Sequence, residues 1–166
     1  MPARFILVIG TFLIALLLYI DRACISVAKG PIVDAFFSSL PVAEQDKLFG
    51  WVLSIFTLGY ALAQTPSGIL ADRFGPRGVL AAVIAAWSFL TALTGAAWNF
   101  LSLLVTRFLF GMGEAGAFPA LARASLSWFP VKERGLVTGI NFSASRLGGA
   151  VALPLMVGLI EALGWR

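Results

Sequence analysis

Two long stretches of this sequence contain no charged residue, and they restrict the folds that are open to it. Residues 48–71 and residues 78–106 are both uncharged and predominantly apolar. As an α-helix, the first stretch alone would be about 36 Å long, which exceeds the ~30 Å hydrocarbon core of a bilayer. Of the 166 residues, 60% are hydrophobic and 12% are charged, and a soluble domain carries about twice that share of charge. The sequence therefore predicts an integral membrane protein.

Five membrane-spanning helices account for the apolar stretches. The uncharged stretch from residue 78 to 106 is too long for one span, so we divide it at Trp98 and Asn99. The polar segments 38–47 and 128–135 are expected to be loops, and Gly30-Pro31 is expected to loosen or end the first helix. The predicted fold class is all-α transmembrane, with helices over residues 4–28, 48–71, 79–97, 100–122 and 136–163.

The basic residues predict the orientation of these helices. Arginine and lysine are more frequent in the short loops on the cytoplasmic side of a membrane protein. On one side, counting loops and helix ends, lie Arg4, Arg73, Arg77, Arg123, Lys132 and Arg134. On the other side lie Lys29, Lys47 and Arg166. We therefore expect a multi-pass protein with a cytoplasmic N-terminus.

The composition also argues against several kinds of partner and chemistry. The net charge is +4, but the basic residues are spread over short loops and form no continuous basic face, so no nucleic-acid partner is expected. The chain has one cysteine, Cys24, and no histidine, which leaves no metal-binding set of the usual kinds. No nucleophile–base pair is evident either, so we expect neither an enzyme nor a bound cofactor.

Five ionisable residues lie well inside the predicted spans: Asp21, Arg22, Arg107, Glu114 and Arg146. Each would cost about 2.5–3.5 kcal/mol at the centre of a lipid-facing helix, so we expect them to face one another or a wet cavity. Counted from the helix ends at the rise of an α-helix, Asp21 and Arg107 fall at similar depths, and Arg146 falls near the midplane. Glu114 lies two turns beyond Arg107 on the same helix face. The sequence thus predicts one interior cavity near these residues.

The chemistry of this set suits an organic anion and a proton. A guanidinium group offers a planar pair of donors that matches a carboxylate. Without histidine, a proton near neutral pH must be carried by a carboxylate, whose charged form is disfavoured by burial and favoured by a nearby arginine. These opposed effects would let Asp21 or Glu114 load and release a proton. Alternatively, the charges pair with one another, Arg107 with Asp21 for example, and only fix the register of the helices.

The segment GILADRFGPR at residues 68–77 resembles the loop between helices two and three of the major facilitator superfamily. It lies at the corresponding place, on the predicted cytoplasmic side. Gly68 is expected to allow close helix contact, and Gly75 a tight turn. The resemblance implies a charge network that latches and releases the cytoplasmic side during transport, formed by Asp72, Arg73 and Arg77.

Further segments are similar to one branch of that superfamily, the anion:cation symporters. They are YIDRACISVA at 19–28, RFLFGMGEAGAFPA at 107–120, WFPVKERG at 128–135, SRLGGA at 145–150 and GWR at the end of the chain. This resemblance implies proton-coupled symport of an organic carboxylate, often a sugar acid such as galactonate, glucarate or a hexuronate. It places proton coupling on Asp21 and Glu114 and substrate binding on Arg22 and Arg107. Tyr19 and Arg146 are further candidate substrate contacts.

Members of this family have two six-helix halves with the substrate site between them. The chain contains about five of the first six helices. We therefore expect it to be the N-terminal part of a longer transporter of the cell inner (plasma) membrane, truncated at Arg166 and lacking its C-terminal half. Two other hypotheses remain open: a sensor or scaffold built on the same bundle, and a symporter of an aromatic or dicarboxylic acid.

Overall fold

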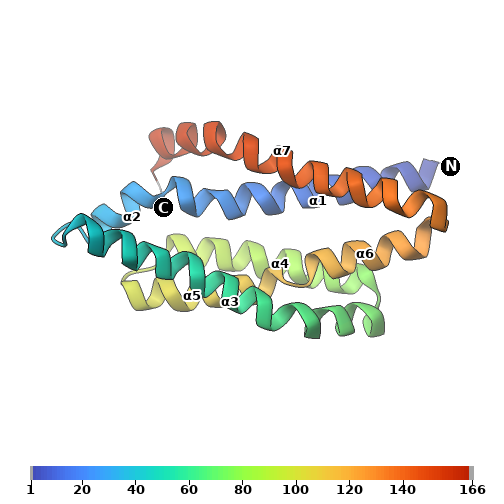
Figure 1. The fold of residues 1–166 in the computed structure, drawn as a ribbon, viewed down its shortest axis with the longest axis horizontal. Helices are drawn as coiled ribbons and strands as arrows, with labels where there is room; N and C mark the ends of the chain where they lie inside the picture. The colour runs from blue at the N-terminus through green and yellow to red at the C-terminus, as the bar shows by residue number, and fades with distance from the viewer. Residues whose placement is uncertain (1, 165–166) are drawn as a thin grey trace. The chain divides into compact units, whose positions relative to one another are not determined.

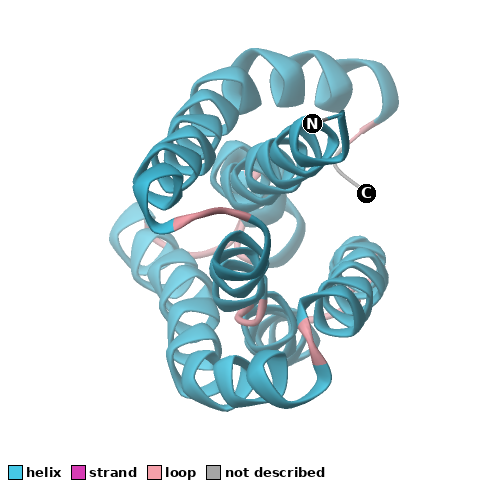
Figure 2. Ribbon diagram, turned by 90° about the vertical axis from the view of Figure 1, so that its right-hand side faces the viewer, coloured by secondary structure: helices cyan, strands magenta, loops and turns pink. Residues whose placement is uncertain are grey.

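The computed structural model of the chain describes residues 2–164, so the GWR segment falls outside it except for Gly164. Within this range the chain consists of helices joined by short loops and turns (Figures 1 and 2). The helices are α1 (Pro2–Val27), α2 (Lys29–Phe36), α3 (Val42–Phe74), α4 (Pro76–Gly95), α5 (Phe100–Glu114), α6 (Ala117–Trp128) and α7 (Val131–Leu163). Five segments are long and apolar enough to cross a membrane: Ala3–Val27, Val42–Phe74, Pro76–Gly95, Phe100–Trp128 and Val131–Ala162. The all-α transmembrane fold class is confirmed.

The two long helices begin earlier than their hydropathy predicts. Segments 38–47 and 128–135 were expected to be loops, but α3 already starts at Val42 and α7 at Val131. Each helix follows a proline in an extended conformation, Pro41 with ψ 146° and Pro130 with ψ 156°. The polar residues after each proline form the first helical turn, where Glu44 and Glu133 are favoured by the positive end of the helix dipole. Hydropathy locates the membrane-buried part of a helix and misses turns that extend into water.

Prolines also explain the interruptions of the first and fourth spans. α1 ends at Val27, and Gly30-Pro31 lies inside the first turn of a separate short helix, α2, where proline needs no hydrogen-bond donor. The predicted helix over residues 100–122 is interrupted after Glu114. Pro119 cannot donate a hydrogen bond to the carbonyl of Ala115, and its ring crowds that carbonyl, so the helix breaks there.

The described residues form two compact units. The first contains residues 2–29 and 124–164, and in it α1 and α7 lie side by side over most of their length (Figure 1). The second contains residues 30–123, and in it α5 packs against both α3 and α4. α6 begins in the second unit and ends in the first.

Glycines let the main helix pairs approach until their backbones touch. A Cβ atom on Gly111 of α5 would meet the Phe56 carbonyl oxygen of α3, and would lie 2.9 Å from the Tyr60 nitrogen. A Cβ atom on Gly148 of α7 would meet the carbonyl oxygen of Leu16 of α1 in the same way. Such contacts are typical of small residues at membrane helix interfaces, where van der Waals packing supplies much of the association energy.

α3 and α7 have several structural features in common. Each is 33 residues long, follows a proline and is followed by a glycine with positive φ, Gly75 at 80° and Gly164 at 81°. Each also has a glycine 17 residues after its first residue, Gly59 (59 − 42) and Gly148 (148 − 131), that touches the backbone of the partner helix. At Gly75, ψ is 156°, a combination that is open essentially to glycine alone. The tight turn predicted at Gly75 is therefore present and requires glycine.

Candidate functional site

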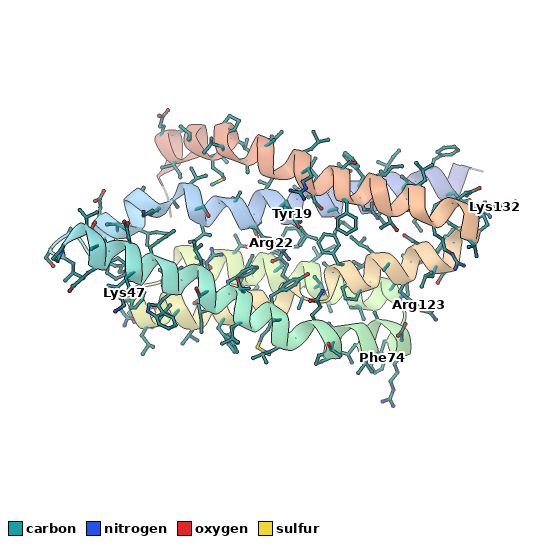
Figure 3. All side chains as sticks on the ribbon, viewed as in Figure 1. Tyr19, Arg22, Lys47, Phe74, Arg123 and Lys132 are labelled. Atoms are coloured by element: carbon teal, nitrogen blue, oxygen red, sulfur yellow. The ribbon has the colours of Figure 1, made fainter. Side chains whose placement is uncertain are left out.

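The first group of candidate residues lies on α1. Tyr19, Asp21 and Arg22 are all partly buried. The guanidinium carbon of Arg22 lies 5.3 Å from the centroid of the Tyr19 ring (Figure 3), which is within the range of a cation–π interaction. Arg22 and Tyr19 are thus brought together, and an aromatic face holds the guanidinium beside a phenolic hydroxyl that can donate to an anion.

The second group lies on α5. Arg107 is 6% exposed and Glu114 is completely buried. The Arg107 guanidinium carbon lies 4.9 Å from the Phe110 ring centroid, so this arginine is also held against an aromatic face. Glu114 is the last residue of α5, next to the interruption that Pro119 causes. Two ionisable side chains buried within a membrane-spanning segment are costly to keep there, which is why such residues commonly mark a functional site.

Arg146 differs from the other candidates because its residue is exposed within this chain. It lies on α7 next to Ser145, which is buried and donates a hydrogen bond to the Asn141 carbonyl at 3.1 Å. A charged side chain on the outer face of a spanning helix requires water or a further polar partner. The exposed face of α7 around Arg146 is therefore the part of this helix that suits an aqueous cavity.

An ion pair that only the fold reveals lies beside the turn between α3 and α4. Oδ1 of Asp72, in the last turn of α3, lies 3.3 Å from Nε of Arg123, in the middle of α6. Arg73 stacks on Phe74, with 5.6 Å from its guanidinium carbon to the ring centroid, and Arg77 is exposed in the first turn of α4. Both partners of the ion pair are well exposed, so it adds little stability. Arg123 entered the sequence prediction only as a cytoplasmic charge, and nothing in its neighbourhood indicated its partner.

Gly68 makes a less demanding contact than predicted. A Cβ atom there would lie 3.8 Å from the Pro119 Cβ atom, which is an ordinary van der Waals distance. The close backbone contacts between α3 and α5 are instead made by Gly59, which the sequence did not single out, and by Gly111. Among the residues that the structure describes, no cluster of three or more acidic, cysteine or histidine side chains is arranged to hold a metal ion.

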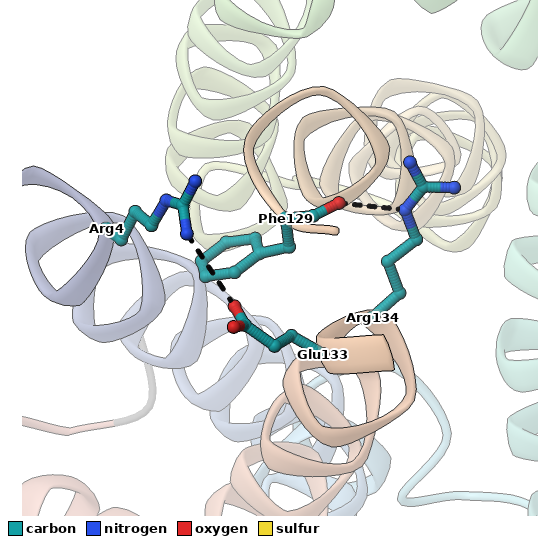
Figure 4. Close-up of polar contacts among 4 residues, drawn as sticks. All are labelled: Arg4, Phe129, Glu133 and Arg134. Carbon is teal, nitrogen blue, oxygen red and sulfur yellow. Dashed lines mark hydrogen bonds and ion pairs between the residues drawn. The ribbon is translucent and has the colours of Figure 1, made fainter. Parts of the chain in front are cut away.

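The link between α6 and α7 is held by charged side chains. Nε and Nη2 of Arg134 each donate a hydrogen bond at 3.0 Å, to the Phe129 carbonyl and the Leu126 carbonyl respectively. Glu133 forms a 3.9 Å ion pair with Arg4 of α1 (Figure 4). The WFPVKERG segment is therefore a structural connector: proline starts α7, arginine binds the last carbonyls of α6, and glutamate reaches α1.

Replacing Arg134 with alanine should destabilise this connector. The substitution removes two hydrogen bonds from a charged donor to carbonyls at the end of α6, and we expect it to cost about 1–2 kcal/mol because the group is partly exposed. The measurement is the free energy of unfolding of the purified protein in mixed detergent, from titration with dodecyl sulfate. Lys132→Ala is the matched control, since Lys132 is an exposed cation two residues away. Equal unfolding midpoints for the two variants would contradict the capping role.

Comparison with known proteins identifies a family and several relatives that this chain matches. Residues 11–166 match the sequence profile of the Major Facilitator Superfamily. The chain is 43% identical over 148 residues to a protein of Cupriavidus necator described as "Probable sulfoacetate transporter SauU", covering 89% of this chain and 33% of that protein. It is 36% identical over 155 residues to the "Probable L-galactonate transporter" of Escherichia coli, covering 93% and 33%. It is 33% identical over 155 residues to the "Hexuronate transporter" of Bacillus subtilis, covering 93% and 35%.

A solved structure gives the same result for the fold. A bacterial homolog of the human lysosomal transporter Spinster, in an inward-facing and occupied conformation, superposes with a TM-score of 0.82 at 31% identity. The match covers 98% of this chain and 34% of that structure. The chain thus spans about a third of the length of the transporters it matches. Since the family profile covers nearly all of its residues, the chain belongs to the Major Facilitator Superfamily.

Proposed function

We propose that the protein containing this chain is a secondary transporter that moves an organic anion across the membrane by alternating access. The observation that carries this proposal is the burial of Arg107 and Glu114 on one face of α5, inside a membrane-spanning segment. Family membership supplies the transport scaffold. Recognition of an anion inside the membrane requires a positively charged group, and binding of a proton requires a carboxylate. Arg107 and Glu114 supply one group of each kind.

Anion recognition is assigned to Arg22, Arg107, Arg146 and Tyr19. Arg22 and Arg107 are each held against an aromatic ring, so their guanidinium groups are oriented before substrate arrives. The planar fork of each group can bind a carboxylate through two hydrogen bonds. The exposed position of Arg146 on α7 is compatible with a third contact from a cavity wall.

Proton coupling is assigned to Glu114 and Asp21. A buried carboxylate is stable in the membrane either protonated or beside a cation. Binding an anion to the neighbouring arginines would therefore change how readily the carboxylate holds its proton. If the bound anion favours binding of the proton, and the bound proton favours binding of the anion, the two cross the membrane together in the same direction, which is symport.

Two substrate classes are supported by the relatives. Sugar acids are supported by the relatives described as transporters of galactonate, hexuronates and galactarate or glucarate, at 33–36% identity. Sulfoacetate is supported by one relative at 43% identity. Both classes carry a carboxylate that arginine can bind, and we propose a sugar acid first because several relatives agree on it. Sulfoacetate is the second candidate.

The remaining features of the transporter follow from the same proposal. We propose that the chain is the N-terminal part of the molecule and that a C-terminal half completes the cavity. We also propose that the protein lies in the inner (plasma) membrane of the cell, with its N-terminus in the cytoplasm. The Asp72–Arg123 ion pair and the neighbouring Arg73 and Arg77 would then form the cytoplasmic gating network. Because that ion pair is exposed and weak, it can break and re-form with little cost during alternating access.

Uptake into proteoliposomes by the complete protein tests the proposal. Radiolabelled galactonate and sulfoacetate are offered separately, with and without an inward proton gradient and an uncoupler. We expect one of the two to accumulate only with the gradient. Failure of both to accumulate, with a folded protein, would remove the organic-anion proposal.

Arg107→Lys tests anion recognition within the same assay. Lysine keeps the charge but loses the two-pronged geometry, so we expect the KM for the transported anion to rise about 10- to 100-fold, as for the loss of a charged hydrogen bond. Lys47→Arg is the matched control, because it exchanges the same two side chains at an exposed position near the start of α3. An unchanged KM in Arg107→Lys would reduce Arg107 to a structural role.

A further inference from the structure

A cavity of about 440 Å³ opens between the first turns of α1 and α7, and none of the candidate transport residues lines it. It is lined by apolar side chains except at one end, where Arg4 and Glu133 meet; the apolar lining is Phe5, Val8, Phe129, Leu136, Val137 and Ile140. All of these residues belong to the same compact unit. The volume is in the range of sites that hold an extended small molecule.

The position of the cavity identifies the surroundings to which it opens. Phe5 and Leu136 are 68% and 69% exposed at its edge, whereas Phe129 and Val137 form a buried floor. Both helices belong to segments that are long and apolar enough to span a membrane, and these segments begin close to the cavity, at Ala3 and at Val131. The apolar part of the cavity therefore lies at the depth of the hydrocarbon just inside the bilayer surface.

The charged end of the cavity carries an excess of positive charge. Arg4, Lys132 and Arg134 are within the first turns of α1 and α7, against the single carboxylate of Glu133. The Arg4–Glu133 pair is 3.9 Å long with both side chains about half exposed, so it is weak and can rearrange. The N-terminus of α7 adds the positive end of a 33-residue helix, and no side chain caps it.

We propose that this cavity binds an anionic phospholipid from the leaflet that surrounds the N-terminal ends of α1 and α7. One acyl chain occupies the apolar hollow between Val8 and Ile140. The phosphate lies at the mouth, beside Arg4 and Lys132 and close to the first amide groups of α7. Basic residues at the edge of an apolar cavity between spanning helices favour anionic headgroups over zwitterionic ones.

Native mass spectrometry of the complete protein tests this site. The protein is released from mixed micelles that contain equal amounts of phosphatidylglycerol and phosphatidylcholine, and the retained lipids are counted. We expect at least about fivefold more phosphatidylglycerol than phosphatidylcholine, since one lysine or arginine near a charged bilayer surface contributes about that factor. Lys132→Gln should reduce this preference about fivefold.

A cavity-filling variant separates this site from general charge attraction. In Ile140→Trp the indole excludes the acyl chain, and each methylene kept out costs about fourfold in affinity, so we expect phosphatidylglycerol retention to fall by at least tenfold. Leu153→Trp is the matched control, because Leu153 is an exposed residue of the same helix outside the cavity lining. Val8→Trp fills the cavity from α1 and provides a second variant if Ile140→Trp does not fold.

Three outcomes would overturn the proposal. Equal retention of the two lipids by the unmodified protein would show that the charged end does not select anions. Full retention of phosphatidylglycerol in the folded cavity-filling variants would place the lipid elsewhere. Little or no retention of either lipid by the unmodified protein would mean that the cavity is closed in the complete protein, for example by another of its own helices or by a second copy.

Discussion

Glu114→Gln should abolish uphill accumulation of the substrate while leaving exchange intact. Glutamine has nearly the same size and hydrogen-bonding capacity, but it cannot release or take up a proton. Each pH unit is worth 1.36 kcal/mol, so a gradient of two pH units can sustain about 100-fold accumulation per proton in a coupled transporter. In the variant we expect the internal concentration to stop at the external one. The measurement is uptake of the transported anion into proteoliposomes with an imposed proton gradient.

Exchange without a gradient distinguishes lost coupling from lost folding. Glu114 is completely buried, and glutamine nearly matches its size, so counterflow of labelled against unlabelled substrate should persist in the variant. We also expect this exchange to become independent of pH. Glu161→Gln is the control, because Glu161 is exposed near the end of α7. Undiminished accumulation by Glu114→Gln would remove Glu114 from the coupling role, and loss of exchange as well would indicate a structural role instead.

Gly111→Val should disrupt the pairing of α3 and α5. A Cβ atom at this position would meet the Phe56 carbonyl oxygen and lie 2.9 Å from the Tyr60 nitrogen. These are backbone atoms of a helix, so they cannot rotate away as a side chain could, and the two helices must separate. Overpacking of well-packed sites costs about 1–3 kcal/mol, and more where the backbone must move. We therefore expect a loss of about 3 kcal/mol or more, measured by dodecyl sulfate titration with far-ultraviolet circular dichroism.

A matched glycine on α3 controls for the intrinsic effect of valine. Gly50 also lies within a helix, and a Cβ atom there would have no neighbour within 4 Å. Gly50→Val therefore changes helix propensity by the same amount without any clash, and should retain near-normal stability. Gly111→Ala should fall between the two, since its methyl group still meets the same carbonyl. If Gly111→Val and Gly50→Val unfold together, the close approach of α3 and α5 does not control stability.

The fold class could be read from the sequence because hydropathy is a property of each segment by itself. The uncharged stretches, 48–71 and 78–106, required helices that cross a bilayer whatever their partners. The family was also predictable, because the motifs that carry it are contiguous, as in residues 68–77. Even the tight turn at Gly75 has a local cause in its positive φ.

Helix boundaries were predicted less well, for a reason that the prolines show. A polar first turn and a polar loop have the same composition, so residues 42–47 and 131–135 looked like loops although Pro41 and Pro130 start helices there. The interruption of the fourth span had a local signal in Pro119, which removes a backbone donor four residues after Ala115. That signal was present in the sequence but was masked by the continuous apolar pattern.

The candidate site, like the fold, could be predicted only in part from the sequence. The sequence by itself determined which residue types stand inside the membrane, since Arg107 and Glu114 are costly there in any arrangement. Only the tertiary structure decided which distant groups meet: Arg123 beside Asp72, and the backbone of Phe108 against Gly59. The physical reason is the range of the interactions. Transfer from water to lipid is summed along one segment, whereas an ion pair or a backbone contact depends on atoms from segments far apart in the chain, which only the packing of the helices brings within a few ångströms.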